Sequence, residues 1–153
     1  MRSTIIAGFP GESRESASLV GKRLKEVGFS HLGVFSYSQE EGTPAAEMPN
    51  QVDEEEKEFR RDAILNRQAA VSHDWQKNRV GKTYEVLVEG QDSQTGLYYG
   101  RSYAEAPEVD GKIFIKSSTP LVTGNYYPVK VTEAYTYDCV GEVDLPKEGG
   151  DTV

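Results

Sequence analysis

Apolar residues follow different periods in the two halves of the chain. Up to about residue 80 they occur in short runs or at spacings of three and four residues, whereas from Lys82 onward they alternate with polar residues. The first pattern is typical of buried strands and amphipathic helices, and the second is typical of half-buried strands. The sequence therefore predicts an α/β part followed by an all-β part.

The first half opens with a strand, a helix and a second strand. Arg2 to Gly8 is apolar and β-branched, which predicts a buried strand. A helix is expected between Ser13, which can cap it, and Gly28, which can end it in the left-handed conformation; its apolar positions are Ala17, Val20, Leu24 and Val27. His31 to Phe35 is the second strand. Such a βαβ unit implies parallel strands with both faces covered.

No further strand is expected before residue 80. Residues 36–52 are a loop rich in glycine and proline, and Asp53 to about Arg79 is charged and favours one long helix or two shorter ones. Its apolar stripes are Phe59, Ala63 and Ala70, and Ile64, Val71 and Trp75. Because two strands cannot form a parallel sheet alone, the first half is interpreted as the last third of a larger α/β domain.

The second half predicts five short strands. Alternation runs through Tyr84, Val86 and Val88, through Leu97 and Tyr99, through Ile113 and Ile115, through Val129 and Val131, and through Val140 and Val143. Glycines separate or interrupt these runs, which is typical of a small closed or partly open antiparallel barrel. We expect the domain boundary near residue 75 and a disordered tail over residues 146–153.

Charge is distributed unevenly along the chain. Residues 1–80 carry 11 Lys and Arg against 13 Asp and Glu, a net charge of −2, whereas residues 81–153 carry 6 against 12, a net charge of −6. An acidic surface repels phosphate backbones and attracts basic proteins. The second half therefore favours a basic protein partner, unless its acidity serves only solubility.

Composition excludes several classes of protein. The 153 residues include no run of about 18 apolar residues and no apolar leader, so we expect no membrane span and a cytoplasmic protein. The single cysteine, Cys139, cannot form an intrachain disulfide, and it is expected to pack as a small hydrophobe. With only His31 and His73 beside it, the chain lacks ligands for zinc or an iron–sulfur cluster. We expect no catalytic residue and no metal site in this chain.

Three segments are candidates for chemistry. The glycine-containing turn after the first strand can present main-chain groups to a planar ligand, although such glycines also serve tight turns. The acidic run Asp53 to Glu56 is interpreted as a solvated first helical turn. The tyrosines Tyr98, Tyr99, Tyr103, Tyr126, Tyr127, Tyr135 and Tyr137 are interpreted as barrel core and rim. A base-stacking platform beside Arg101, Lys112 and Lys130 is the alternative.

Specific segments give the chain a resemblance to a known family. The first half resembles the end of the radical S-adenosylmethionine barrel of the methylthiotransferases, through Ile6-Ala7-Gly8-Phe9-Pro10-Gly11-Glu12, Val34-Phe35-Ser36-Tyr37-Ser38 and Glu40-Glu41-Gly42-Thr43-Pro44-Ala45-Ala46. The second half resembles their TRAM domain, through residues 80–90, Gly100-Arg101-Ser102, residues 106–111 and Tyr137-Asp138. The order and spacing of these segments agree with the family over nearly all of residues 2–144.

Within the family, the chain is most similar to the branch that methylthiolates an aspartate of ribosomal small-subunit protein twelve. Glu40 stands where the tRNA-modifying relatives usually carry arginine, and residues 106–111 are similar to those of the branch. Gln39, where proline is common, and Cys139, where leucine is usual, are departures that look conservative for function.

The resemblance implies a fold, sites and partners. Residues 1–74 would be the C-terminal part of the radical SAM core, a partial TIM-type barrel, and residues 75–145 an OB-like TRAM barrel of about five antiparallel strands. Ile6, Gly8, Phe35 and Tyr37 would line the adenine side of S-adenosylmethionine, and Glu40, Glu108 and Asp110 would bind substrate.

The resemblance also implies what this chain cannot do alone. The family's CxxxCxxC loop and three further cysteines, which hold two [4Fe-4S] clusters in the complete enzyme, have no counterpart among these residues. The chain is therefore expected to be an inactive piece of a longer protein that carries no cofactor by itself.

Three functions remain open at this point. The first is a fragment of a methylthiotransferase acting on ribosomal small-subunit protein twelve, with TRAM recognising the protein. The second is a TRAM module that binds RNA or protein without chemistry. The third is a fragment of a tRNA adenosine methylthiotransferase.

Overall fold

The structure is a computed structural model that describes residues 1–145. The chain divides into two compact units, the first over Met1–Ser72 and the second from His73 onward. The predicted disordered tail, residues 146–153, lies outside the described residues.

The first unit is built on two parallel strands. Strand β1, Arg2–Ala7, pairs in parallel with β2, His31–Ser36, from Arg2 opposite His31 to Ala7 opposite Ser36. Helix α1, Arg14–Val27, connects them, and the short 3-10 helix η1, Pro44–Glu47, lies in the loop that leads to α2, Glu54–Lys77. The predicted βαβ unit is confirmed, and the charged segment forms one long helix.

Helix α1 begins and ends where the sequence predicts. The Ser13 hydroxyl accepts a hydrogen bond from the Ser16 N–H at 3.1 Å, which satisfies one free donor of the first turn. At the other end, Gly28 adopts φ 69° and donates its N–H to the Leu24 carbonyl. A side chain would be strained in this left-handed conformation, so glycine ends the helix at little cost.

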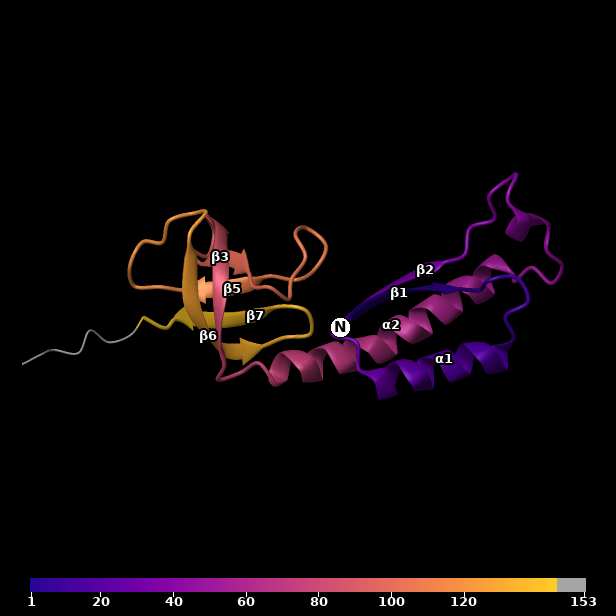
Figure 1. Ribbon diagram of the computed structural model, residues 1–153, viewed down its shortest axis with the longest axis horizontal. Helices are drawn as coiled ribbons and strands as arrows, with labels where there is room; N and C mark the ends of the chain where they lie inside the picture. The colour runs from indigo at the N-terminus through magenta and orange to yellow at the C-terminus, as the bar shows by residue number, and fades with distance from the viewer. Residues whose placement is uncertain (146–153) are drawn as a thin grey trace, which may run out of the picture. The chain divides into compact units, whose positions relative to one another are not determined.

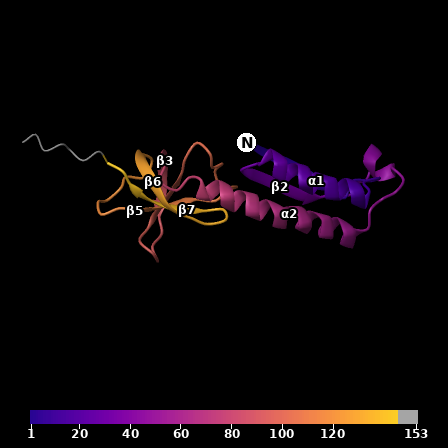
Figure 2. The same ribbon diagram turned by 90° about the horizontal axis from the view of Figure 1, so that it is seen from below.

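Both helices lie on the same face of the two-stranded sheet (Figures 1 and 2). The core under that face consists of Ala7, Leu24, Val34 and Ile64, with Ile5, Val20, Phe29, Leu32 and Leu65 packed against it. Side chains alternate between the faces of a strand, so Ile6 and Phe35 point the other way and are 56% and 62% exposed. The prediction that both faces are covered is wrong for the described residues, because no described element lies over the second face.

The buried side of α2 is largely polar. Ile64 is its one buried apolar side chain among the described residues, and it shares the buried stripe with Lys57, Arg60, Gln68, Ser72 and Gln76. Phe59, on a predicted apolar stripe, is 69% exposed. On the other predicted stripe, Ile64 is buried and Val71 and Trp75 are half-buried. The polar side chains of the buried face take part in hydrogen bonds with backbone groups or carboxylates, which allows their burial.

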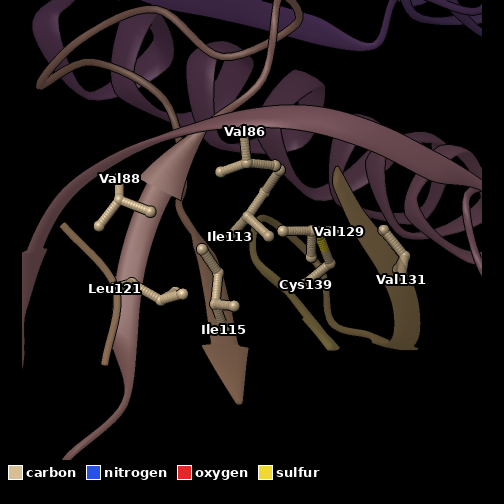
Figure 3. Packing of buried hydrophobic residues seen from close by; sticks show 8 residues of the cluster. All are labelled: Val86, Val88, Ile113, Ile115, Leu121, Val129, Val131 and Cys139. Atoms are coloured by element: carbon tan, nitrogen blue, oxygen red, sulfur yellow. The ribbon is translucent and has the colours of Figure 1, made fainter. Parts of the chain in front are cut away.

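The second unit is a closed barrel with strand order β3-β4-β5-β7-β6. The strands are β3 Thr83–Gln91, β4 Tyr98–Arg101, β5 Ile113–Lys116, β6 Tyr126–Ala134 and β7 Cys139–Val143. Their inward side chains meet in one core, shown in Figure 3: Val86, Val88, Ile113, Ile115, Leu121, Val129, Val131 and Cys139. The alternating positions from Tyr84 onward thus predicted the strands, and Cys139 packs as the expected small hydrophobe.

One strand pair in the barrel is parallel, which corrects the prediction of an antiparallel barrel. β5 pairs with β7 in parallel, from Ile113 opposite Cys139 to Lys116 opposite Glu142, while the other four pairs are antiparallel. The reason is geometric. Antiparallel neighbours must alternate in direction, and an odd number of strands closed into a ring cannot alternate all the way round.

The barrel tyrosines divide between core and surface. Tyr84, Tyr98 and Tyr127 pack against the core, and Tyr103, Tyr126, Tyr135 and Tyr137 are exposed.

Among the residues described, neither helix is both long enough and apolar enough to cross a membrane.

Hydrogen exchange should distinguish the two sheets. We expect the amides of β1 and β2 to exchange faster than those of the barrel, because each of these two strands has an unpaired edge and one bare face, whereas every barrel strand is paired on both sides. The measurement is amide exchange read by mass spectrometry on a sample shown to be monomeric by ultracentrifugation. Equal protection of Ile5 and Val34 with Val86 and Val131 would contradict the expectation.

Candidate functional site

The carboxyl end of the parallel strands brings four predicted residues together. Ile6 and Phe35 are opposite one another in the register and expose their side chains on the bare face. Gly8 and Tyr37 each follow the end of a strand, and the Tyr37 N–H donates to the Ala7 carbonyl at 2.8 Å. In parallel sheets, ligands bind in the crevice beyond this end of the strands.

A network of charged side chains holds the turn after β1. The Gly8 N–H donates to the Glu12 carboxylate at 3.1 Å. Arg60 donates to the same carboxylate at 2.8 Å and to the Glu12 carbonyl at 2.9 Å. Burial alone would lower the pKa of Arg60, but its hydrogen bonds to Glu12 and Glu56 outweigh burial, and the pKa is raised. The guanidinium therefore stays charged and fixes the turn.

Lys57 also packs against this turn. The residue is 1% exposed, and its ammonium group donates to Glu54 at 2.7 Å and lies 5.2 Å from the centre of the Tyr37 ring. Gly8 has φ 77°, and a Cβ there would run into the Lys57 side chain. Tyr37 is held further by an edge-on contact with Phe9, with ring centres 5.3 Å apart.

This edge is suited to binding rather than to proton transfer. It offers main-chain groups, the exposed Ile6 and Phe35 side chains and the Tyr37 ring. The buried Tyr37 hydroxyl has no hydrogen-bond partner within the described residues. Such a surface suits a flat ligand with an apolar face and a polar rim.

The three predicted substrate residues do not form one cluster in either unit. Glu40 lies exposed in the loop after β2, where the Ser38 hydroxyl donates to it at 2.8 Å. Glu108 and Asp110 lie in the loop between β4 and β5 of the second unit. Glu108 is exposed at φ 60°, and the Asp110 carboxylate accepts the Ala106 N–H at 2.6 Å. Asp110 thus closes its own loop, and Glu108 is the freer of the two.

A buried ion pair that the sequence analysis missed anchors this loop. Arg79 pairs with Glu105, and both side chains are almost fully buried. The Ser102 N–H donates to the other Glu105 oxygen at 2.8 Å, and Arg79 also donates to the Ser102 hydroxyl at 3.1 Å. The Arg79 guanidinium packs over the Tyr84 ring at 4.5 Å. The base of the loop that presents Glu108 is therefore fixed by buried polar contacts.

The pKa values of Arg79 and of the nearby Cys139 are both shifted. Burial by itself would lower the pKa of Arg79, but Glu105 and hydrogen bonds raise it overall. Burial raises the pKa of the nearby Cys139 thiol to about 11. The thiol stays protonated at neutral pH, so it is a poor nucleophile and a poor metal ligand.

The acidic start of α2 is part of these networks rather than a metal site. Glu56 accepts from Arg14 at 3.2 Å and from Arg60 at 3.1 Å, and Glu54 accepts from Lys57. Residues 1–145 contain no group of three or more acidic, histidine or cysteine side chains arranged to hold a metal ion. The run interpreted as a solvated turn is thus partly engaged in ion pairs.

Comparison with known proteins finds relatives along nearly the whole chain. The TRAM domain family matches residues 80–143. The chain is 46% identical over 143 residues to the ribosomal protein uS12 methylthiotransferase RimO of Caldicellulosiruptor saccharolyticus, covering 94% of this chain and 32% of that protein. With the same coverage, it is 43% identical to the RimO of Clostridium botulinum and 45% identical to that of Clostridium kluyveri. The chain has the sequence of a RimO-type methylthiotransferase segment with a TRAM domain.

This RimO-type segment spans about a third, 32%, of the length of each of these relatives. The TRAM match takes in all five barrel strands, Glu105 and the loop with Glu108 and Asp110. Arg79 lies immediately before it. The buried ion pair therefore ties the segment that precedes the TRAM match to a loop inside it.

Removing the charge of Glu105 should destabilise the barrel. Glu105→Gln leaves the buried Arg79 guanidinium without its counter-charge, and breaking a buried pair costs about 3–5 kcal/mol. Urea unfolding followed by the fluorescence of Trp75, the only tryptophan, measures the loss. Glu133→Gln is the matched control, because its pair with Lys116 is half exposed and 3.8 Å long; it should cost less than about 1 kcal/mol. Equal losses in the two variants would contradict a structural role for Glu105.

Proposed function

We propose that the chain is the C-terminal part of a methylthiotransferase that adds a methylthio group to an aspartate of ribosomal small-subunit protein twelve. The observation that carries the proposal is the identity of 46% over 94% of the chain to a protein named as a ribosomal protein uS12 methylthiotransferase. In this proposal, residues 1–74 are the last βα units of the radical SAM barrel and residues 75–145 are the TRAM domain. The bare face of β1 and β2 is then the side turned to the barrel interior.

Ile6, Gly8, Phe35 and Tyr37 are proposed to hold the adenine side of S-adenosylmethionine. Their position at the carboxyl end of parallel strands, the exposed Ile6 and Phe35 side chains and the unpartnered Tyr37 hydroxyl fit a flat heterocycle with a polar rim. When bound in the complete enzyme, this group supplies the methyl and radical chemistry. The residues of this chain orient it and shield it from water.

The two [4Fe-4S] clusters of the complete enzyme do not fit the residues described here. Cys139 is inside the barrel core with a raised pKa, and the described residues contain no other cysteine. We therefore assign the clusters to the part of the relatives that this chain does not match, and no step of the reaction is derived through them.

The acidic second half is proposed to recognise the basic substrate protein, with Glu108 and Asp110 in the loop between β4 and β5 and Glu40 in the first unit. Two basic residues of the alternative base-stacking platform are already engaged. Arg101 pairs with Glu89 at 2.5 Å, and the Lys112 ammonium lies 4.4 Å from the centre of the Tyr99 ring. The pair with Glu89 offsets the charge of Arg101, which favours the protein substrate over tRNA and over a general RNA-binding module.

The preference between protein and RNA can be measured directly. We expect the whole chain to bind ribosomal protein twelve more tightly than tRNA, because a net charge of −6 over residues 81–153 attracts a basic surface and repels phosphates. Calorimetry at two salt concentrations should show the protein complex weakening as salt is added. Glu108→Gln should weaken the complex more than Glu85→Gln, which removes an equal charge at an exposed control position on β3. Tighter binding of tRNA would favour the tRNA-modifying alternative.

The chain should neither bind an iron–sulfur cluster nor cleave S-adenosylmethionine by itself. Its one cysteine is buried and protonated, so it offers no thiolates for a cluster. Reconstitution with iron and sulfide, followed by desalting and absorbance spectroscopy, should leave no cluster band. A stoichiometric, redox-active cluster on the monomer would overturn the assignment of cluster ligands to the unmatched part of the relatives.

A further inference from the structure

A groove of about 480 Å³ runs between α1 and α2 within the first unit, and no residue proposed to hold S-adenosylmethionine lines it. Small side chains line it on both helices: Ala17 and Gly21 on α1, and Ala63 on α2. Ile64, which is 6% exposed, belongs to the core beneath. Small residues at facing positions leave a trough between two helices that larger side chains would fill.

Phe59 gives this groove an exposed aromatic side. It lines the groove and is 69% exposed, although it stands on a stripe that the sequence predicts to be apolar. At the other end, the Arg67 guanidinium lies over Gly21, close enough that a Cβ at residue 21 would collide with it. The groove thus combines an apolar floor, an exposed aromatic ring and a guanidinium.

The charge of the groove is opposite to that of the chain. Three arginines line it, Arg14, Arg60 and Arg67, against one carboxylate, that of Glu56. This carboxylate already accepts hydrogen bonds from Arg14 and Arg60. Arg60 is buried and also pairs with Glu12, so the lining together with this partner has three arginines against two carboxylates, a net charge of about +1 on a chain with a formal charge of −8.

We propose that this groove binds an acidic amphipathic helix of another protein. Apolar side chains of the helix would pack on Ala17, Ala63 and Phe59, and its carboxylates would face Arg14 and Arg67. A trough between two helices accepts a third helix by the packing of ridges into grooves, and apolar anchors at three- and four-residue spacing are typical of such recognition. Charge complementarity selects an acidic helix over a basic one.

The test is a selection of helical peptides from a random library against the immobilised whole chain. We expect the selected peptides to carry apolar residues at helical spacing together with Asp and Glu. A synthetic selected peptide should bind the chain, and the same peptide with every acidic residue changed to lysine should not. Enrichment of basic peptides, or no enrichment over empty beads, would overturn the proposal.

Substitutions at the groove locate the binding site. Phe59→Ser and Arg67→Glu should each weaken the selected acidic peptide at least about tenfold, which corresponds to about 1.4 kcal/mol. The matched controls are Leu19→Ser, which removes an exposed apolar side chain of α1 outside the groove, and Lys22→Glu, which reverses an exposed charge outside it. All four positions are exposed, and circular dichroism confirms that each variant keeps its fold.

The remaining outcomes are also decisive. Peptide binding that Phe59→Ser and Arg67→Glu leave unchanged places the peptide elsewhere and overturns the proposal. Self-association of the chain that Phe59→Ser abolishes, seen by ultracentrifugation, makes a second copy the occupant and equally overturns it. None of these results depends on whether the chain belongs to a methylthiotransferase.

Discussion

Each unit depends on hydrogen bonds from buried polar side chains of α2 and of Arg79, which follows the helix. In the first unit, Arg60 closes the turn after β1, and Gln68 donates to the Phe29 carbonyl at 2.7 Å, which holds the turn before β2. In the second, Gln76 donates to the Tyr137 carbonyl at 2.9 Å, and Arg79 closes the loop after β4. A buried polar group without a partner costs about 1–3 kcal/mol, so each donor is tied to a specific turn geometry.

The turns and loops that carry the candidate site residues are thus fixed by contacts with buried charged side chains. The turn that presents Gly8 rests on Lys57 and Arg60, and the loop that presents Glu108 rests on the Arg79–Glu105 pair. Recognition requires main-chain groups and carboxylates in fixed positions, because freezing a mobile loop on binding costs conformational entropy. At the proposed sites, the buried charges of Lys57, Arg60 and Arg79 would therefore order the turns before a ligand binds, without touching the ligand.

Local patterns in the sequence predicted the elements well, and long-range pairing less well. Ser13 and Gly28 marked the ends of α1 because capping depends on residues only a few positions apart. Lys57 and Arg79 were not singled out from the sequence, because burial of a charge depends on partners such as Glu105, which lies 26 residues beyond Arg79. The glycine turn after β1 was recognised as a candidate site, but nothing in its own residues indicates Lys57 beneath it. The parallel pair of β5 and β7 follows from closing the ring, which no single strand reveals.

Closure of the ring through β5 and β7 also affects how the barrel is made on the ribosome. β7 follows the other four strands of the barrel in the sequence, so the parallel pair forms only once residues 139–142 have been synthesised and have left the exit tunnel. Until then the growing chain exposes unpaired edges on β5 and β6. Open edges of this kind pair readily with other chains. The five-residue strand β7 therefore contributes to the core and also covers the open edges of β5 and β6, which until then can pair with other chains.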